Sequence, residues 1–476
     1  MPAAYRDGCG LTSTRNFLSM PVPADLEKYV SDHKARFTEE LFEFLRIPSV
    51  SARSEHNRDT ARAAEWLRSS MEAIGLEAKL HETAGHPVVV GEWRGAPGKP
   101  TVLIYGHYDV QPPEPLHLWT SPPFEPAIRD GNIYARGSVD DKGQIYLHIK
   151  ALEAHLRTRG KLPVNVVVLV EGEEEVGSDH LEPFVREQRE RLRADAVVIS
   201  DSAMFAPGQP SLLSSLRGLA YFEIEVRGPA SDLHSGSYGG AVVNPATALA
   251  RIIATLHDGN GRIAIEGFYD AVEEWDEEIL QQMRSLPFDE EHFRREVGVP
   301  ELNGEAGRST LERLWARPTC EVNGLLSGYT GEGAKTVLPS YAMAKVSCRL
   351  VPRQEPAEIE RLMERHVKRV APKGVTVTVK HLHGGRPWRA SLEGGIYDAA
   401  KRALHAAFGT EPIVAGEGGS IPVVSDFASI LGAPVLLVGF GLPGENAHAP
   451  DEWMSVENFE SGIRAMATLW DEYGSS

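Results

Sequence analysis

The sequence predicts an α/β protein in which one domain is interrupted by a second domain of a different kind. Three observations lead to this prediction. Short β-branched apolar runs separated by helical stretches are typical of strands buried on both faces of a mainly parallel sheet. The middle of the chain instead alternates apolar and polar residues, as antiparallel strands with one wetter face do. After about Gly394 the first pattern returns, so an inserted α+β domain divides the first domain into two segments.

The first segment should begin with two helices and continue into the sheet. Apolar residues recur at three- and four-residue steps over residues 25–45 and 60–74. Gly75 ends the second helix, because glycine is the favoured left-handed residue after a helix. Buried strands are predicted at residues 87–90, 101–105, 164–170 and 196–199, with a further helix over 145–156.

The inserted domain is placed at residues 214–388. Its alternating strands are predicted around Phe222–Val226, Ala342–Leu350 and Val375–Val379. A helix begins at Asn244, which suits the N-cap and is followed by a proline at the first helical position. Residues 260–318 are acidic and helical in character, so we interpret them as an insertion within this domain.

The first domain therefore comprises residues 25–213 and 389–476. Its second segment contains a buried strand at 434–438 and a last helix that carries Val456 to Leu469. Residues 1–24 lack a continuous apolar segment and are expected to form a flexible N-terminal tail.

Composition narrows the function classes. The 476 residues include 67 acidic and 49 basic side chains, a formal charge of −18, which argues against nucleic acid or an anionic membrane as a general partner. No apolar run approaches the roughly 18 residues of a membrane span. The three cysteines form no CxxC motif, so we expect a reduced, cytoplasmic protein without a disulfide framework.

Histidine and carboxylate residues follow the predicted buried strands. Sites in open parallel sheets form beyond the carboxyl ends of the strands, so these residues should meet at one edge. Imidazoles and carboxylates together suit zinc or manganese. Taken singly, each has an ordinary explanation as a turn, a cap or a solvated charge run, but their joint placement predicts a metal site. The segments contain His107, Asp109, Asp140, Asp141, the run Glu171–Glu175, Asp201 and His448.

Three of these segments, and one segment of the inserted domain, form longer motifs. They are YGHYDVQP at 105–112, ARGSVDDKG at 135–143, EGEEEVGS at 171–178 and DLHSG at 232–236. The motifs resemble those of the dinuclear-metal aminopeptidase/aminoacylase superfamily and, within it, the carnosinase and cytosolic non-specific dipeptidase group. The resemblance extends from about residue 25 to the end of the chain. It implies that the inserted domain serves as a lid and dimerisation domain of a homodimer.

The resemblance also implies a site with two divalent metal ions, zinc or manganese. The implied ligands are His107 and Asp201 for one ion, Glu175 and His448 for the other, and Asp140 as the bridge between them. Asp109 would accept the ring N–H of His107 and so fix its tautomer. The peptide bond between Asp140 and Asp141 is expected to be cis.

The remaining implied roles are catalytic and substrate-binding. Glu174 would act as general base for a metal-bridged hydroxide that attacks an amide carbonyl. His234, supplied by the partner chain, would stabilise the oxyanion. Arg349 would bind the substrate carboxylate, and Thr336 and Ser420 match further substrate-contacting positions.

Two substrate classes remain open from the sequence. The group resemblance implies hydrolysis of dipeptides, and an N-acyl-amino-acid amidohydrolase would use the same dinuclear site. A metal-buffering or scaffold protein is a non-enzymatic alternative, but such a protein would not need the base Glu174.

Other hydrolase and nucleotide-binding motifs fit poorly. The segment 328–336 approaches a P-loop but has one residue too many before Lys335 and no good helix behind it. The sequence has no clean GxSxG elbow, and its cysteines lack a catalytic context.

Overall fold

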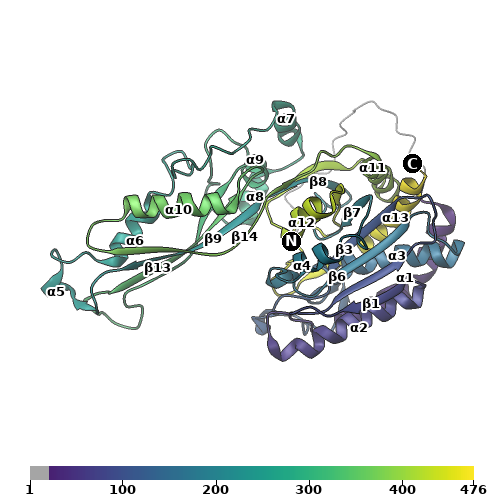
Figure 1. Cartoon of the computed structure of the whole chain (residues 1–476), viewed down its shortest axis with the longest axis horizontal. Coiled ribbons are helices and arrows are strands. Elements are labelled where there is room, and N and C mark those ends of the chain that lie inside the picture. Colours follow the sequence, from purple (N-terminus) through teal and green to yellow (C-terminus); the bar gives the residue numbers. More distant parts are fainter. Residues whose placement is uncertain (1–20, 476) are drawn as a thin grey trace. The chain divides into compact units, whose positions relative to one another are not determined.

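The computed structural model describes residues 21–475, which divide into two compact units (Figure 1). The first unit contains the chain up to residue 214, residues 390–415 and residues from 423 onward; the second contains residues 215–389 and 416–422. The short segment 416–422, which the sequence analysis counted with the first domain, packs with the second unit. Residues 1–20 of the predicted tail lie outside the described residues, and a helix already begins at Ala24.

The first unit is built on a mixed, mainly parallel sheet, which confirms the predicted fold class. Its strands occur in the order β1-β2-β6-β3-β7-β17-β8. The central pairs β6–β3, β3–β7 and β7–β17 are parallel, and β1, β2 and β8 run antiparallel to their neighbours. The strands are β1 (Glu77–His81), β2 (Val88–Trp93), β3 (Thr101–His107), β6 (Asn165–Glu171), β7 (Ala196–Ile199), β8 (Ser211–Leu216) and β17 (Val435–Leu437).

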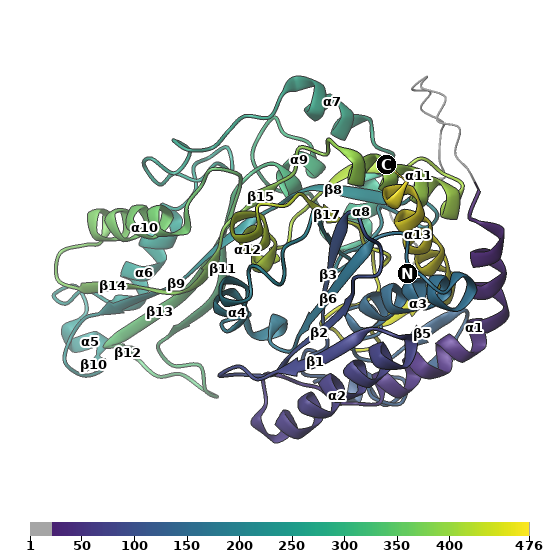
Figure 2. The same cartoon turned by 45° about the vertical axis from the view of Figure 1, so that its right-hand side comes forward.

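Helices flank this sheet (Figure 2). The helices α1, α3, α11 and α13 pack against one another, and the central strands are buried along nearly their whole length. That burial explains the uninterrupted valine and isoleucine runs in the sequence. The helices are α1 (Ala24–Leu45), α2 (Asn57–Ile74), α3 (Lys142–Arg159), α4 (Leu181–Glu187), α11 (Gly395–Phe408), α12 (Pro422–Leu431) and α13 (Val456–Gly474).

Smaller strands complete the sheet topology. A three-stranded sheet has the order β18-β5-β4, and β15 and β16 both pair with β8. These strands are β4 (Ala127–Arg129), β5 (Asn132–Tyr134), β15 (Trp388–Arg389), β16 (Ile413–Glu417) and β18 (Trp453–Ser455).

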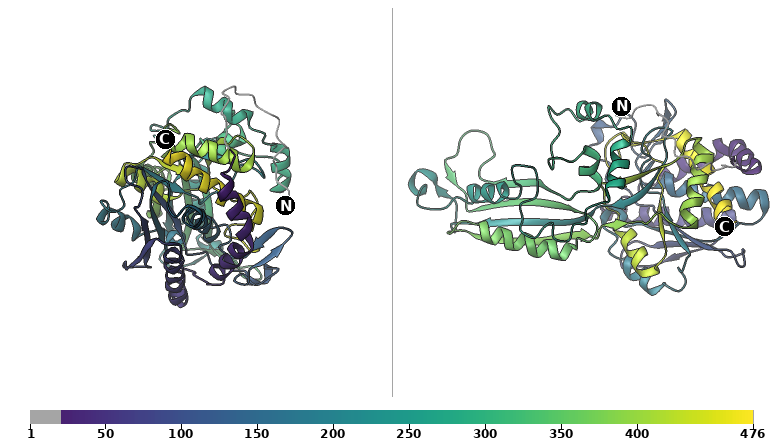
Figure 3. Two further views of the ribbon diagram at one scale, coloured as in Figure 1. Left: turned by 90° about the vertical axis from the view of Figure 1, so that its right-hand side faces the viewer. Right: turned by 90° about the horizontal axis from the view of Figure 1, so that it is seen from above.

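The second unit has a four-stranded antiparallel sheet, also as predicted, in the order β11-β13-β9-β14. Figure 3 shows its long strands. Alternate residues of β9 and β13 are buried against α6 and α10, which produces the alternating sequence pattern. The elements are β9 (Gly218–Arg227), β11 (Thr319–Ser327), β13 (Tyr341–Leu350), β14 (Thr376–Gly385), α6 (Pro245–Ala254) and α10 (Pro356–Val370).

The remaining elements of this unit include a short ribbon and the predicted acidic insertion. The ribbon pairs β10 (Leu233–His234) with β12 (Val337–Leu338), and α5 (Ser235–Tyr238) follows β10. The insertion contains α7 (Glu277–Ser285), α8 (Glu290–Glu296) and α9 (Thr310–Trp315). A capping box between Ser309 and Glu312 fixes the start of α9. Across residues 21–475, no helix has the length and apolar character needed to cross a bilayer.

Candidate metal centre

The sheet of the first unit brings the predicted metal ligands to one edge. His107 is the last residue of β3, and Asp201 follows β7 by two residues. Asp140 precedes α3, and its peptide bond to Asp141 is cis, as predicted. The parallel register explains this convergence, because strands that run in one direction end on the same side of the sheet.

Asp140 lies between two histidines. Its Oδ1 is 3.1 Å from Nε2 of His107, and its Oδ2 is 2.8 Å from Nε2 of His448. Two groups of potential ligand atoms share it, His107–Asp140–Asp201 and Asp140–Glu175–His448, and within each group the atoms lie within 4.8 Å of one another. These are the two ligand sets that the family resemblance implied. A carboxylate that presents one oxygen to each set has the arrangement needed to bridge two cations.

Two buried residues that the sequence analysis did not identify hold Asp140 in place. Arg136 Nη1 donates to Glu452 Oε2 at 2.6 Å, and both side chains are almost fully buried. Glu452 also accepts hydrogen bonds from the backbone N–H groups of Gly137, Val139 and Asp140. Because Glu452 follows His448 in the same loop, it links the two segments that carry these ligands. No sequence pattern distinguished Glu452 from an exposed loop carboxylate.

Asp109 connects His107 to the glutamate loop. Nδ1 of His107 lies 3.0 Å from the backbone oxygen of Asp109 and 3.4 Å from its Oδ1. The Asp109 carboxylate also accepts hydrogen bonds from the backbone N–H groups of Glu174 and Glu175, at 3.3 and 3.1 Å. Asp109 is fully buried. Contacts at Nδ1 leave Nε2 of His107 available on the side that faces Asp140.

The glutamate run folds so that its members have different surroundings. Residues 174–176 form a single 3-10 turn, and Gly177 ends it with φ +106°, a conformation that favours glycine. A side chain at Gly172 would meet the ring of Tyr108 at about 2.4 Å, so this position requires glycine as well.

Two of the four glutamates are held away from the candidate metal ligands. Glu171 accepts hydrogen bonds from Tyr105 and Ser178, and Glu173 pairs with His180 at 2.9 Å. Glu175 instead accepts a hydrogen bond from Gln111 at 2.7 Å and lies 3.4 Å from His448. Glu174 and Glu175 therefore remain as the pair beside the candidate ligands.

The electrostatics of the cluster favour bound cations. Burial and the neighbouring negative charges raise the pKa of Glu174 well above its usual range, that of Glu175 to about 9 and that of Asp201 to about 6. Burial would also raise the pKa of Asp140, but hydrogen bonds with His107 and His448 lower it. A concentration of carboxylates that raise one another's pKa values is suited to divalent cations, which compensate the shared charge.

The predicted residues of the second unit form two separate pairs. His234 and Thr336 belong to the first pair, on the β10–β12 ribbon, where Ser235 N–H donates to the Thr336 carbonyl at 3.0 Å. Nδ1 of His234 accepts the Gly236 N–H at 3.1 Å. This tautomer places the ring proton of a neutral His234 on Nε2, and the side chain is exposed.

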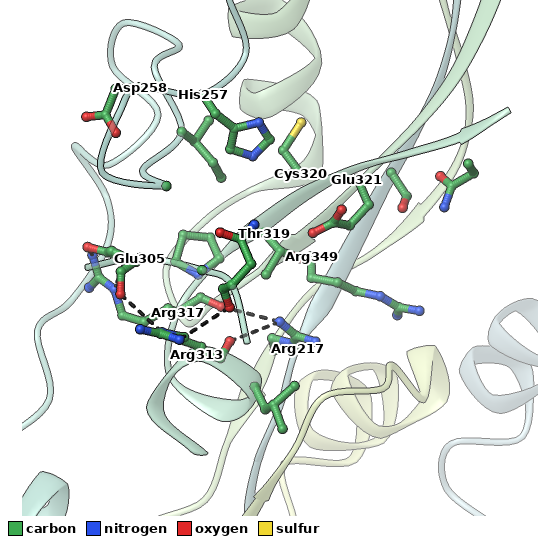
Figure 4. Close-up of a pocket in the computed structure, with 18 of the residues that line it drawn as sticks. Arg217, His257, Asp258, Glu305, Arg313, Arg317, Thr319, Cys320, Glu321 and Arg349 are labelled. Carbon is green, nitrogen blue, oxygen red and sulfur yellow. Dashed lines mark hydrogen bonds and ion pairs between the residues drawn. The ribbon is translucent and has the colours of Figure 1, made fainter. Parts of the chain in front are cut away.

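Arg349 and Ser420 form the second pair. Nη1 of Arg349 donates to the Ser420 hydroxyl at 2.8 Å, and that hydroxyl donates to the carbonyl of Arg217 at 2.5 Å. Figure 4 shows Arg349 and Arg217 among the residues lining a cavity of about 890 Å³ in this unit. Burial and the charge of Arg349 lower the pKa of Arg217 to about 10. This end of the second unit is therefore suited to an anionic group.

The two pairs lie toward opposite ends of the long strands. Tyr341, beside the ribbon, pairs with Arg227, whereas Arg349 pairs with Leu219 at the other end of β9 and β13. The eight steps from Tyr341 to Arg349 correspond to about 27 Å of extended strand. One copy of the second unit therefore does not bring His234 and Arg349 together.

The chain is similar to known peptidases over most of its length. The family model of Peptidase family M20/M25/M40 matches residues 103–472. A Cys-Gly metallodipeptidase of Schizosaccharomyces pombe is 34% identical over 466 residues, covering 94% of this chain and 98% of the relative. The crystal structure of human carnosine dipeptidase 1 superposes with a TM-score of 0.84 at 30% identity, covering 96% of this chain and 100% of that one.

A metallo-carboxypeptidase from Sulfolobus solfataricus, Sso-CP2, shows a similar likeness. Its TM-score is also 0.84, its identity is 35%, and the match covers 92% of this chain and 99% of the other. The likeness in each case spans both units of the chain, so it covers the candidate metal ligands as well as the inserted sheet.

Proposed function

Because the chain belongs to peptidase family M20/M25/M40, we propose that it is a dipeptidase that uses Glu174 as general base. The observation that carries this proposal is the position of Asp140, whose two carboxylate oxygens face His107 and His448 separately. Relatives named as dipeptidases match nearly the whole length of the chain and support the choice of substrate.

The donor set fits two divalent cations, with zinc and manganese the candidates. His107 and Asp201 would hold one ion, Glu175 and His448 the other, and Asp140 both. When bound, such ions act as Lewis acids that polarise a carbonyl group and lower the pKa of water. Glu452 and Arg136 serve this site indirectly, because Glu452, paired with Arg136, holds the backbone N–H groups of Gly137, Val139 and Asp140.

Glu174 supplies the proton transfers. Burial and the charges of Asp201, Glu175 and Asp140 raise the pKa of Glu174. Two bound cations would lower this pKa again, because they compensate the shared negative charge. Glu174 can take a proton from the attacking water and deliver it to the leaving amine. Asp109 holds the backbone of Glu174 and also contacts His107, which fixes the base relative to that ligand.

Arg349 and Ser420 would bind the carboxylate of the substrate. The guanidinium group can donate two parallel hydrogen bonds to a carboxylate. Ser420 orients this guanidinium and is itself fixed by the Arg217 carbonyl. Arg217 also donates through Nε to the Gly418 carbonyl at 3.0 Å, so it braces the loop that carries Ser420.

The proposed enzyme is a homodimer in which His234 serves the active site of its partner. A dipeptide spans only about 7 Å, whereas the ribbon that carries His234 and the position of Arg349 in the same chain are separated by about 27 Å of extended strand. A second copy can supply the missing histidine. The edge strand β11 offers a surface for such pairing, because Leu325 and Leu326 are 65% and 55% exposed.

The tautomer of His234 suits the proposed role. Its Nδ1 accepts the Gly236 N–H, so Nε2 carries the proton and can donate it to a developing oxyanion. Thr336 lies beside His234 on the ribbon, so it would reach the same active site of the partner chain.

The test is an assay of the zinc and manganese forms on a panel of dipeptides and N-acetyl amino acids. We expect turnover of dipeptides that requires added metal. Preference for the N-acetyl amino acids would instead identify an N-acyl-amino-acid amidohydrolase. A metal-loaded, folded protein that is inert toward both classes would contradict the proposal and favour a metal-buffering or scaffold role.

A further inference from the structure

A small cavity adjoins the candidate metal ligands within the first unit. Its volume is about 240 Å³, and Asp140 and Asp201 form part of its wall. The loop after β17 also lines the cavity, with Gly441 and Glu445 among its lining residues. The cavity therefore combines two predicted metal ligands with a carboxylate that no ligand set includes.

Glu445 is buried without full hydrogen bonding. Only 3% of the residue is exposed. Its Oε1 accepts the Ser455 N–H at 3.3 Å, but Oε2 has no hydrogen-bond partner within the described part of the chain. Burial raises the pKa of this carboxyl to about 8, although the backbone N–H groups of Leu442 and Ser455 act to lower it. A buried carboxylate oxygen without a donor is unfavourable, so the position is explained if a ligand supplies the donor.

The backbone around Glu445 fixes the side chain at this wall. Glu445 N–H donates to the Leu442 carbonyl at 3.3 Å, and its own carbonyl accepts the Trp453 N–H at 3.0 Å. The residue is therefore anchored on both sides. The hydroxyl of Ser202, which also lines the cavity, likewise has no partner among residues 21–475.

The residues that line the cavity favour a small cation that can donate hydrogen bonds. Its charged wall groups Asp140, Asp201 and Glu445 are all acidic. A third metal ion fits less well, because the clusters of three or more potential ligands in the described residues do not include Glu445. A primary ammonium group carries one positive charge and three donors, which match a carboxylate and a hydroxyl.

We propose that Glu445 binds the free amino group of the substrate's N-terminal residue. This inference rests on the proposed peptidase function and specifies its substrate class. A dipeptide carries its amino group on the α-carbon next to the scissile carbonyl, and therefore close to the groups that act on that carbonyl. An N-acyl amino acid lacks the ammonium and would leave Glu445 buried and unpaired. The enzyme therefore selects dipeptides with a free N-terminus over acylated amino acids.

The first test uses the wild-type protein in its metal-loaded form. Alanylglycine is compared with propionylglycine, which has the same shape without the amine, and with N-acetyl-alanylglycine. We expect kcat/KM to be about 10- to 100-fold higher for alanylglycine, as a charge-assisted hydrogen bond predicts. Equal cleavage of alanylglycine and propionylglycine would overturn the inference. Because this test uses only the wild-type protein, it does not depend on whether a variant folds.

The second test assigns the preference to Glu445. Glu445→Gln should lower kcat/KM for alanylglycine by about 10- to 100-fold and leave propionylglycine within about twofold, so the preference disappears. Glu445→Asp keeps the charge and should retain part of it. The matched control is Glu457→Gln on the exposed side of α13, which should preserve the wild-type preference.

The outcomes separate this inference from the proposed function. If the wild-type protein cleaves no dipeptide, the proposed function fails. If it cleaves alanylglycine with a preference that Glu445→Gln leaves intact, only the role of Glu445 fails. An equal fall for both substrates, or a third metal ion that Glu445→Gln loses, would also overturn the assignment to an amino group.

Discussion

Nε2 of His448 lies 2.8 Å from Oδ2 of Asp140, although the two residues lie on opposite sides of the inserted unit in the sequence. The other oxygen of Asp140 faces His107. His448 has a φ of +62°, and Glu452 in the same loop holds the backbone N–H of Asp140. The meeting of these side chains therefore depends on the folded loop.

Asp140→Ala should lose both metal ions, because its carboxylate belongs to both ligand sets. Asp201→Ala is the matched comparison in the same site and should lose one ion, since it belongs to only one set. Metal content per chain after gel filtration measures both. Two ions retained by Asp140→Ala would falsify the bridging role.

Glu174→Gln should slow turnover by about 10²- to 10⁴-fold through loss of the proton acceptor, while metal content stays at the wild-type level. The control is Glu173→Gln, whose carboxylate pairs with His180 instead of the candidate ligands. That variant should keep most of the activity. If Glu174→Gln loses metal and keeps its turnover per bound ion, then Glu174 is a ligand and the roles of the adjacent glutamates are reversed.

Arg349→Ala should raise KM by about 10- to 100-fold for dipeptides with a free C-terminal carboxylate, because a charge-assisted hydrogen bond is lost. The same dipeptides with an amidated C-terminus should respond little. Arg353→Ala provides a control, since that arginine is 71% exposed and pairs with Glu273. A comparable rise in KM for both kinds of substrate would show that Arg349 stabilises the fold of the second unit and does not bind the substrate carboxylate.

Mixing an inactive Glu174→Gln chain with an inactive His234→Ala chain should restore part of the activity. In a mixed dimer one site combines an intact Glu174 with an intact His234, if the histidine serves the partner chain. His234→Ala alone should reduce turnover by about 10²- to 10³-fold, as expected for one oxyanion donor. If subunit exchange is verified and no activity returns, or if the active protein is a monomer, then His234 acts in the active site of its own chain or takes no part in catalysis.

His148 should make the stability of the first unit depend on pH. It is fully buried in α3 beside the Ser200 hydroxyl, and burial lowers its pKa from 6.5 to about 3. The unfolded chain therefore binds a proton that the folded protein excludes. Stability from this residue is fully present above pH 6.5 and falls as the pH decreases toward 3, by at most about 1.4 kcal/mol per pH unit.

Urea unfolding of metal-free protein between pH 4.5 and pH 7 measures this dependence. His148→Gln cannot titrate, so its free energy of unfolding should vary less with pH than that of the wild type. His117→Gln, at an exposed position, should match the wild type. Identical pH slopes for His148→Gln and the wild type would contradict the assignment.

The sequence by itself determined the fold class and the composition of the candidate metal site. Strands buried on both faces require uninterrupted apolar residues, as in β3 and β6, and a sheet with one exposed face requires alternation, as in β13. Each pattern depends only on residues that are near one another in the chain, so it can be recognised in the sequence. The residues after the strands, such as His107 and Asp201, followed from the rule that parallel strands end at one edge.

Only the tertiary structure shows which polar residues are buried and how far apart the predicted site residues lie. Glu452 and Glu445 look like ordinary loop carboxylates in the sequence, but one holds the Asp140 backbone and the other faces a cavity without a donor. The separation of His234 from Arg349 likewise follows from strand register. The physical reason is that burial and hydrogen bonding depend on contacts between segments far apart in the chain, whereas periodicity depends only on neighbours.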